Sequence, residues 1–353
     1  MEAPLPPSKS HVGGVIAICL SLAVVIIIIF FAMTNLSLFT NLFNLSNSTT
    51  TFSVSTVTGT NLTIAYPPNY NTLANYSLSL INADRANFNV SGVTLSPIQS
   101  AQEHAYSMLV NGYFSHWDTQ GFKPYMRYTI VNGTGDVEEN VAFESSSVPA
   151  FVTTSQVETA ISNLEHDMVY NDEACCQNGH LLNIINPYHN RVSIGIEYNS
   201  TNVYFVEDFE NYYINLNTPI FTSSNQSVAL QGSTFTPLSP DSVIVFYDPT
   251  PAPINASVLN SEYQKPYDEG RFLGGAIPCL GSLQPCDKFS EGITVRPGIW
   301  DLTNSSVDIV FSLQQFINED GSGAYTIYLT QNTFASNPND TESLTSISIF
   351  IQA

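Results

Sequence analysis

Basic residues are scarce in this chain. Its 353 residues include nine Lys and Arg against 30 Asp and Glu, which gives a formal net charge of −21 at pH 7. Proteins that bind nucleic acid need clustered positive charge to displace counterions from phosphates, so the sequence excludes this function. The same shortage disfavours attachment to anionic lipid through basic residues. Only 11% of the residues are charged, and Asn, Ser and Thr supply much of the polar surface instead.

Several common catalytic motifs are also missing. The sequence has no G-x-S-x-G nucleophile elbow, no phosphate-binding loop, no H-E-x-x-H zinc motif and no dinucleotide-binding glycine set. It also lacks the spacing of an EF-hand calcium loop. These absences argue against the enzyme classes whose chemistry depends on those motifs.

Cysteines are few, and their pairing is open. Cys19 lies in a long apolar run, and the other four form two close pairs, Cys175-Cys176 and Cys279/Cys286. Four cysteines allow three pairings, and the sequence does not choose among them. Cys279 and Cys286 flank a short loop that a disulfide could close. Cys175 and Cys176 would then be free thiols or a vicinal disulfide, and an oxidising exterior suits either arrangement.

A membrane segment is the clearest local feature. Val12–Met33 is an almost unbroken apolar run without a charged residue, and about 20 such residues can cross a bilayer as a helix. A cleaved signal peptide is the alternative, but its apolar region is shorter, about 7–15 residues. Lys9 precedes the run, and the next basic residue is Arg85. The positive-inside rule therefore predicts a cytoplasmic tail over residues 1–11 and a cell-membrane protein whose remainder is extracellular.

The part after this segment is rich in glycosylation signals. Residues 34–73 are dominated by Thr, Ser and Asn and predict a glycosylated stalk that forms no core of its own. Twelve Asn-x-Ser/Thr sequons lie downstream of the apolar run, and none lies before it. They predict glycans in an extracellular compartment at Asn35, Asn44, Asn47, Asn61, Asn75, Asn89, Asn132, Asn199, Asn225, Asn255, Asn304 and Asn339.

Residues 74–214 predict an α/β domain. Apolar residues recur at helical spacing in four places. The first helix runs from Tyr76 to Asn89, and the second begins at Ser96 and ends at Gly112. A short third helix covers residues 123–130, and the fourth begins at Ser155. Two alternating runs, residues 192–198 and 203–209, flank a turn and predict a β-hairpin. Helices followed by a hairpin favour a mixed fold.

Residues 215–353 predict a second domain, a β-sandwich. No helix is convincing in this part of the sequence. Short β-type runs recur between turn residues, at residues 242–247, 292–296, 307–313, 324–329 and 346–351.

Five segments of residues 76–213 occur in a distinctive order. They are Leu80–Ala86, Asn111–His116, Glu138–Ala142, Gly179–Pro187 and Val192–Glu197. In this order they resemble the landmarks of the CAP superfamily of cysteine-rich secretory and pathogenesis-related proteins, and in particular its bacterial and archaeal SCP-type branch. The resemblance implies an α-β-α sandwich. The sequence departs from the family pattern in two places. Position 138 is Glu, where the family usually has glycine. The segment over residues 169–178 is longer than the corresponding connection in bacterial members.

The resemblance also implies a cleft with two histidines and two acidic residues. By motif, the histidines are His116 and His180, which would bind a metal, and the first acid is Glu139, in a catalytic role. The second acid falls on Asp167, with Glu165 as the alternative. Two imidazoles and a carboxylate can hold zinc or another divalent metal, and Glu139 could take a proton from metal-bound water. The alternative interpretation is a polar cleft whose histidines and carboxylates are hydrogen-bonded without metal.

The other histidines carry weaker expectations. His104 is expected to be structural or exposed, His166 to be exposed on a helix, and His189 to face solvent in a turn.

Three functions fit these features. The preferred one is an extracellular binding module for a protein, lipid or glycan ligand. The alternative is a zinc-assisted, peptidase-like hydrolase using His116, His180 and Glu139. The third is a structural envelope protein. The preference for binding rests on the lack of an assured nucleophile or third metal ligand, since fold resemblance alone does not settle function.

Overall fold

The computed structural model describes residues 53–54, 66–217, 220–278, 288–303, 305–332 and 341–352. The expected membrane helix over residues 12–33, Cys279, Cys286 and six of the sequons lie outside these residues. Within the described ranges, no helix is both long and apolar enough to span a bilayer. All of these residues belong to one compact unit, Phe52–Ala353. The expectation of a mixed α/β chain is confirmed by its helices and three sheets.

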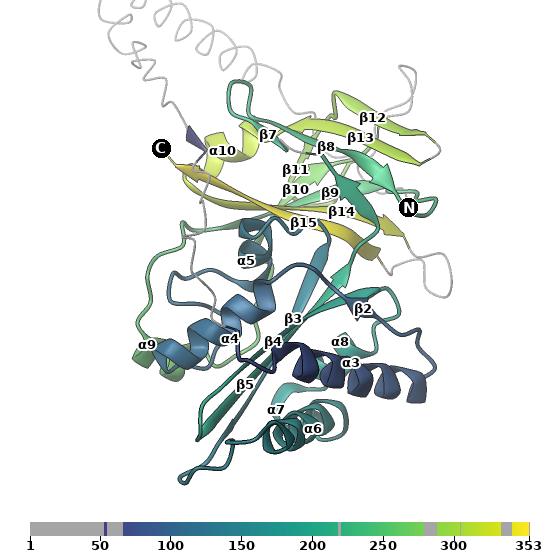
Figure 1. Cartoon of the computed structure of the whole chain (residues 1–353). Coiled ribbons are helices and arrows are strands. Elements are labelled where there is room, and N and C mark those ends of the chain that lie inside the picture. Colours follow the sequence, from purple (N-terminus) through teal and green to yellow (C-terminus); the bar gives the residue numbers. More distant parts are fainter. Residues whose placement is uncertain are drawn as a thin grey trace, which may run out of the picture. The chain divides into compact units, whose positions relative to one another are not determined.

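A four-stranded sheet lies at the centre of the first part of the chain (Figure 1). Its order is β2 (Thr94–Leu95), β4 (Arg191–Tyr198), β5 (Asn202–Asn211) and β3 (Asp136–Ser145). The predicted hairpin is β4–β5, in which Tyr198 pairs with Val203. Asn199 closes the turn because its side-chain oxygen accepts hydrogen bonds from the backbone N–H groups of Thr201 and Asn202.

Helices cover both faces of this sheet. One face packs against α3 (Tyr70–Asn87), α6 (Thr154–Tyr170) and α8 (Gly179–Ile184), and the other packs against α4 (Ser100–Asn111). The period of two along β5 explains the sorting. Phe205 and Phe209 join the core on the α3 and α6 side, and Tyr204 and Val206 join the core on the α4 side. The short helices α5 (Pro124–Ile130) and α7 (Glu173–Cys176) complete this part.

Three helices begin at other residues than the sequence predicts. Helix α3 already begins at Tyr70, within the expected stalk. Helix α4 begins at Ser100, because the Ser96 hydroxyl accepts a hydrogen bond from the N–H of Ile98 and forms a turn before the helix. Helix α6 has its capping box at Thr153 and Gln156, two residues before the expected start.

Two further sheets form the rest of the described chain and share one hydrophobic core. The larger has the order β1 (Ser53–Val54), β15 (Thr341–Gln352), β14 (Gly323–Asn332), β9 (Ser242–Asp248), β10 (Arg271–Ala276) and β11 (Ile293–Val295). The smaller has β12 (Ile299–Thr303), β13 (Ser306–Ser312), β8 (Ser227–Thr234) and β6 (Ile214–Leu216), and β7 (Phe221–Thr222) also pairs with β8. Each of the five predicted runs overlaps one of these strands.

Two helices interrupt this β-rich part, contrary to the expectation of none. Helix α9 (Ala256–Glu262) begins at Asn255, whose side chain accepts a hydrogen bond from the N–H of Val258. Helix α10 (Gln314–Asp320) buries Phe316 and Ile317. Each has only seven residues. They bury only one or two apolar side chains each, so the sequence carries little helical periodicity there.

Candidate functional site

Glu139 is the centre of a buried polar network. It lies on β3 opposite Asp208 of β5, and it is 4% exposed. Its Oε2 accepts a hydrogen bond of 2.5 Å from a terminal nitrogen of Arg127 and lies 2.7 Å from Nδ1 of His104. Its Oε1 lies 2.9 Å from Nδ1 of His116. The predicted pair of His116 and Glu139 is therefore in contact, together with two residues that the sequence analysis did not place there.

The charges of this network favour an ionised Glu139. Burial alone raises the pKa of this carboxyl, but the Arg127 guanidinium and the hydrogen bonds from His104 and His116 outweigh burial and hold the pKa well below its usual value. Burial and the neighbouring Arg127 lower the pKa of His104, so that ring is neutral and donates its Nδ1–H to Glu139. A carboxylate stabilised in this way is a weak base.

Arg127 also fixes the backbone around His116. Its second terminal nitrogen donates to the carbonyl oxygens of His116, at 2.7 Å, and Phe122, at 2.8 Å. The side chain is 8% exposed and extends from α5 to Glu139 on the sheet. Its charge is paired with Oε2 of Glu139, the oxygen that also contacts His104.

The opposite face of the sheet holds a second acidic pair. Glu165 of α6 is 2% exposed, and burial together with the neighbouring Glu207 raises its pKa well above the usual range. Burial raises the pKa of Glu207 to about 7, and Asn140 donates a hydrogen bond to this residue. Adjacent residues of a strand face opposite ways, so Asn140 and Glu207 lie on the other side of the sheet from Glu139.

Asp167 lies apart from this acidic pair. Its side chain is exposed and accepts a hydrogen bond from Asn171 on the same helix. Of the two acids that the resemblance left open, Glu165 is the buried one. It lies against Glu207, on the opposite face of the sheet from Glu139. His166 is exposed, as expected.

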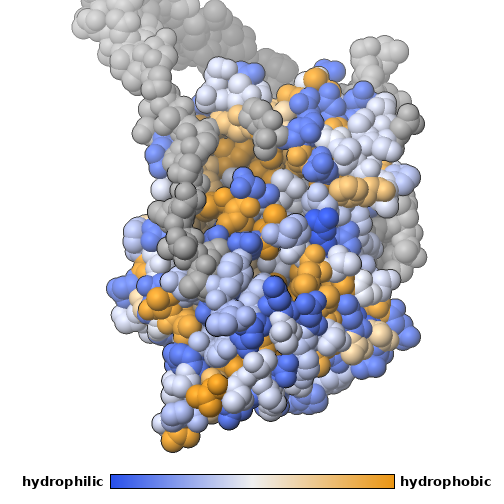
Figure 2. All heavy atoms as spheres, viewed as in Figure 1, coloured by the Kyte–Doolittle hydropathy of each residue, from blue (hydrophilic) through white to orange (hydrophobic). Residues whose placement is uncertain are grey.

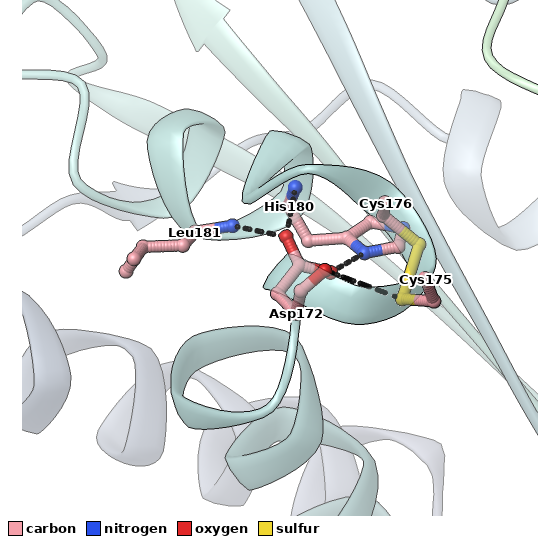
Figure 3. The surroundings of a disulfide bond; sticks show 5 residues. All are labelled: Asp172, Cys175, Cys176, His180 and Leu181. Carbon is pink, nitrogen blue, oxygen red and sulfur yellow. Dashed lines mark hydrogen bonds and ion pairs between the residues drawn. A yellow bond between two sulfur atoms is a disulfide. The ribbon is translucent and has the colours of Figure 1, made fainter.

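His180 belongs to a separate group around α7 and α8 (Figure 3). Its Nδ1 lies 2.6 Å from Oδ1 of Asp172, and the other oxygen of Asp172 accepts hydrogen bonds from the N–H groups of His180 and Leu181. Cys175 and Cys176 form a vicinal disulfide beside this pair. The sequence leaves that disulfide open, and its only signal for Asp172 is the position eight residues before His180.

A His/Cys/Asp group that could hold a metal therefore exists. Asp172, Cys175, Cys176 and His180 each have a ligand atom within 4.8 Å of the others, and within the described part of the chain no other group of three or more such residues does. The group contains His180 but neither His116 nor Glu139. Because Arg127 already neutralises Glu139, a divalent cation bound beside His116 would have to compete with this guanidinium. Shared metal binding by His116 and His180 stays a prediction.

Hydrogen bonds connect the first and the fourth of the five motif segments. Arg85 of the first segment is fully buried and donates hydrogen bonds to the carbonyl oxygens of Ile184, Asn186 and His189, which follow His180. His189 is also buried, contrary to expectation, because its two ring nitrogens contact Asn183 and Asn211. Arg85 thus connects the first motif to the fourth.

A cavity of about 250 Å³ is lined in part by Trp117, the residue that follows His116 in the sequence. Trp117 and Tyr263 line it with rings in edge-to-face contact, 5.1 Å apart between centroids. Lys123 and Asp248 add an ion pair of 2.8 Å. Three prolines complete one wall, at positions 249, 251 and 253. The cavity combines aromatic surface with a small number of oriented polar groups, which is typical of ligand sites.

Six sequons fall within the described residues, and the asparagine of each is exposed. Their accessibility is compatible with glycans at Asn75, Asn89, Asn132, Asn199, Asn225 and Asn255, and occupancy stays a prediction.

Comparison with known proteins gives matches among solved structures only. No protein-family model and no curated protein matches the chain. An extracellular protein containing an SCP domain from Bacillus anthracis is 18% identical, with a TM-score of 0.30, over 41% of this chain and 44% of that protein. The CAP domain of enterococcal PrgA is 14% identical, with a TM-score of 0.29, over 38% and 58%. This chain thus spans about half the length of each. Both are SCP or CAP domains, the group that the five motifs resemble.

Proposed function

We propose that residues 74–214 form a CAP-type α-β-α domain, followed by a β-sandwich over residues 215–353. The five ordered motifs and the helices on both faces of the four-stranded sheet support this assignment. On this basis the chain is a membrane-anchored, glycosylated protein that binds a ligand at the outer cell surface. The anchor is the apolar segment over residues 12–33.

One observation favours binding over turnover. Both carboxylate oxygens of Glu139 are engaged, by Arg127 and His104 on one side and by His116 on the other. A general base needs a pKa near the working pH, and the pKa of this carboxyl is well below its usual value. Glu139 therefore acts as the anchor of a rigid polar network beneath the surface that carries His116.

The cavity beside Trp117 is the proposed ligand site. Polar and apolar side chains are interspersed on the face shown in Figure 2, so hydrophobicity does not mark a partner site on that face. A volume of about 250 Å³ lies below that of sites for drug-sized molecules, about 300–1,000 Å³. It suits one terminal group of a larger partner. Trp117 and Tyr263 offer flat apolar faces beside the Lys123–Asp248 ion pair, a combination that fits a sugar unit of a surface glycan.

Binding of glycans to the whole chain in detergent tests this proposal. We expect retention on a glycan array, and a loss of at least about tenfold for Trp117→Ala, because truncating a central aromatic residue costs 2 kcal/mol or more at binding sites. Phe235→Ala is the matched control, since Phe235 is an aromatic residue that is 58% exposed. Equal binding by both variants, or binding to peptides alone, would reject the glycan site.

A zinc-assisted hydrolase is the second candidate. The contact between His116 and Glu139 is the observation that favours it, because a histidine and a carboxylate form part of many hydrolytic sites. Incubation of the whole chain with peptide and ester libraries, with and without zinc, separates the two functions. We expect no turnover. Zinc-dependent turnover that Glu139→Gln abolishes would establish the hydrolase instead.

The membrane arrangement has its own test. Sealed cells treated with protease are expected to lose the glycosylated part and to keep a fragment that contains residues 1–33. A fragment pattern with the opposite orientation would contradict the cytoplasmic N-terminus.

A further inference from the structure

The turn between α7 and α8 brings His180 to the two cysteines. Gln177 and Asn178 adopt left-handed backbone conformations, with φ of 55° and 64°, and Gly179 follows as the first residue of α8. Two successive residues in this conformation reverse the chain within one turn. As a result, the His180 ring lies beside the cysteines and against the Asp172 carboxylate (Figure 3).

We propose that Asp172, Cys175, Cys176 and His180 form a redox-controlled zinc site, closed by the vicinal disulfide and opened by its reduction. Two thiolates, an imidazole and a carboxylate supply the four protein ligands of a tetrahedral zinc site. Their ligand atoms already lie within 4.8 Å of one another. Disulfide sulfur has no negative charge to offer a metal, and the thiolate is the form that binds. The oxidation state of Cys175 and Cys176 therefore controls access of the metal.

The chemistry balances with a dithiol as the reductant. The dithiol transfers two electrons and two protons to the Cys175–Cys176 bond, and it leaves as a disulfide. Zinc then replaces the two thiol protons and binds both sulfurs. His180 binds the metal through a ring nitrogen that carries no proton.

Burial within the group matches these roles. Cys175 is exposed and Cys176 and His180 are half-buried, so a reductant and a metal can reach them. Asp172 is buried and is held by the N–H groups of His180 and Leu181, so its carboxylate is fixed before any metal binds. Cys175 Sγ lies 3.5 Å from Oδ1 of Asp172, which gives the reduced thiol an acceptor. This site does not depend on the ligand cavity, so its failure would leave the proposed binding function unaffected.

Zinc binding by the whole chain in detergent, before and after reduction, tests the proposal. The reductant is a water-soluble phosphine, which takes oxygen from water to form its oxide as it reduces the disulfide. We expect the reduced chain to bind one more zinc per chain than the oxidised chain, by equilibrium dialysis and metal analysis. With cobalt in place of zinc, the reduced chain should show thiolate-to-cobalt charge-transfer absorption.

Matched variants assign the metal to these residues. Cys175→Ser with Cys176→Ser should lose the additional zinc and the cobalt band, and Cys279→Ser with Cys286→Ser should keep both. His180→Ala should weaken binding by at least about tenfold, whereas His166→Ala, on an exposed helix position, should not. Equal zinc binding in both redox states, or retention of the additional zinc by the Cys175/Cys176 variant, would overturn the proposal.

Discussion

Buried acids with raised pKa values should make the folded chain less stable as pH rises. Glu197 is the residue at which this effect can be tested by itself. Glu197 of β4 is 5% exposed, and Oε1 accepts a hydrogen bond of 2.7 Å from Gln102 of α4. Burial raises its pKa to about 7, although the hydrogen bond from Gln102 acts in the opposite direction. Because the folded state binds the proton more tightly than the unfolded state, this group stabilises the fold below about pH 4.5. That contribution is lost as pH rises through about 7.

The magnitude follows from the two pKa values. The pKa is raised from the ordinary value of 4.5 to about 7, and each pKa unit corresponds to about 1.4 kcal/mol. The chain should therefore lose about 3 kcal/mol of unfolding free energy through Glu197 alone between pH 4 and pH 8. Glu197→Gln removes the titration and retains an oxygen that can accept from Gln102. We expect the variant to match the parent at pH 4 and to exceed it by about 3 kcal/mol at pH 8.

Urea unfolding of the whole chain at pH 4, 5.5, 7 and 8 measures this difference. Glu291→Gln is the matched control, because Glu291 is exposed, and its effect should not vary across the series. Two results would refute the reasoning. One is a Glu197→Gln variant that is no more stable than the parent at pH 8. The other is a Glu197→Gln variant that differs from the parent by the same amount at every pH.

Three further predictions concern other parts of the fold. Arg127→Met should lower the unfolding free energy by about 3–5 kcal/mol, because it leaves the buried Glu139 charge without a cation; adding Glu139→Gln should recover part of the loss, and no recovery in a double-mutant cycle would contradict the ion pair. Gly195→Ala should cost at least about 1–3 kcal/mol in urea unfolding, because its Cβ would lie 2.1 Å from the carbonyl oxygen of Ala101 in α4; Gly298→Ala, which meets only an atom at 3.7 Å, is the control, and equal losses would contradict the close packing. Asn255→Ala should cost about 1 kcal/mol of stability by removing the cap of α9. Asn255→Asp should keep the cap while removing the sequon, so melting curves and glycopeptide mass spectrometry separate the two roles, and equal destabilisation by both would point to the glycan.

The sequence predicted the elements whose pattern is long and regular. The alternation over residues 192–198 and 203–209 predicts β4 and β5 because successive side chains of each strand enter two different cores, one on each face of the sheet. The capped starts of α4 and α6 were predicted only to within a few residues, because several Ser and Thr residues near each start could act as the cap. Helices α9 and α10 were not predicted, since tertiary burial rather than periodicity stabilises them.

The candidate site was predictable in part. The contact of His116 with Glu139 agrees with the motif-based pairing. Arg127 and His104 belong to none of the five segments, and only the packing of α4 and α5 on one face of the sheet brings them to Glu139. The burial of Glu165 rather than Asp167 depends on which side of α6 meets the sheet. Adjacent positions on a helix point about 100° apart, so an error of two residues in a motif alignment changes the assignment completely.

The shortage of cations and the raised pKa values of buried acids have one origin. Nine Lys and Arg cannot pair with 30 Asp and Glu, and Arg127 is already paired with Glu139. Glu165, Glu207 and Asp208 are nonetheless buried, where an unpaired charge is costly. Burial therefore raises the pKa of each, and a bound proton takes the place of a cation. In this chain protonation is one of the interactions that hold the sheet to its helices, so the stability of the fold has to depend on pH.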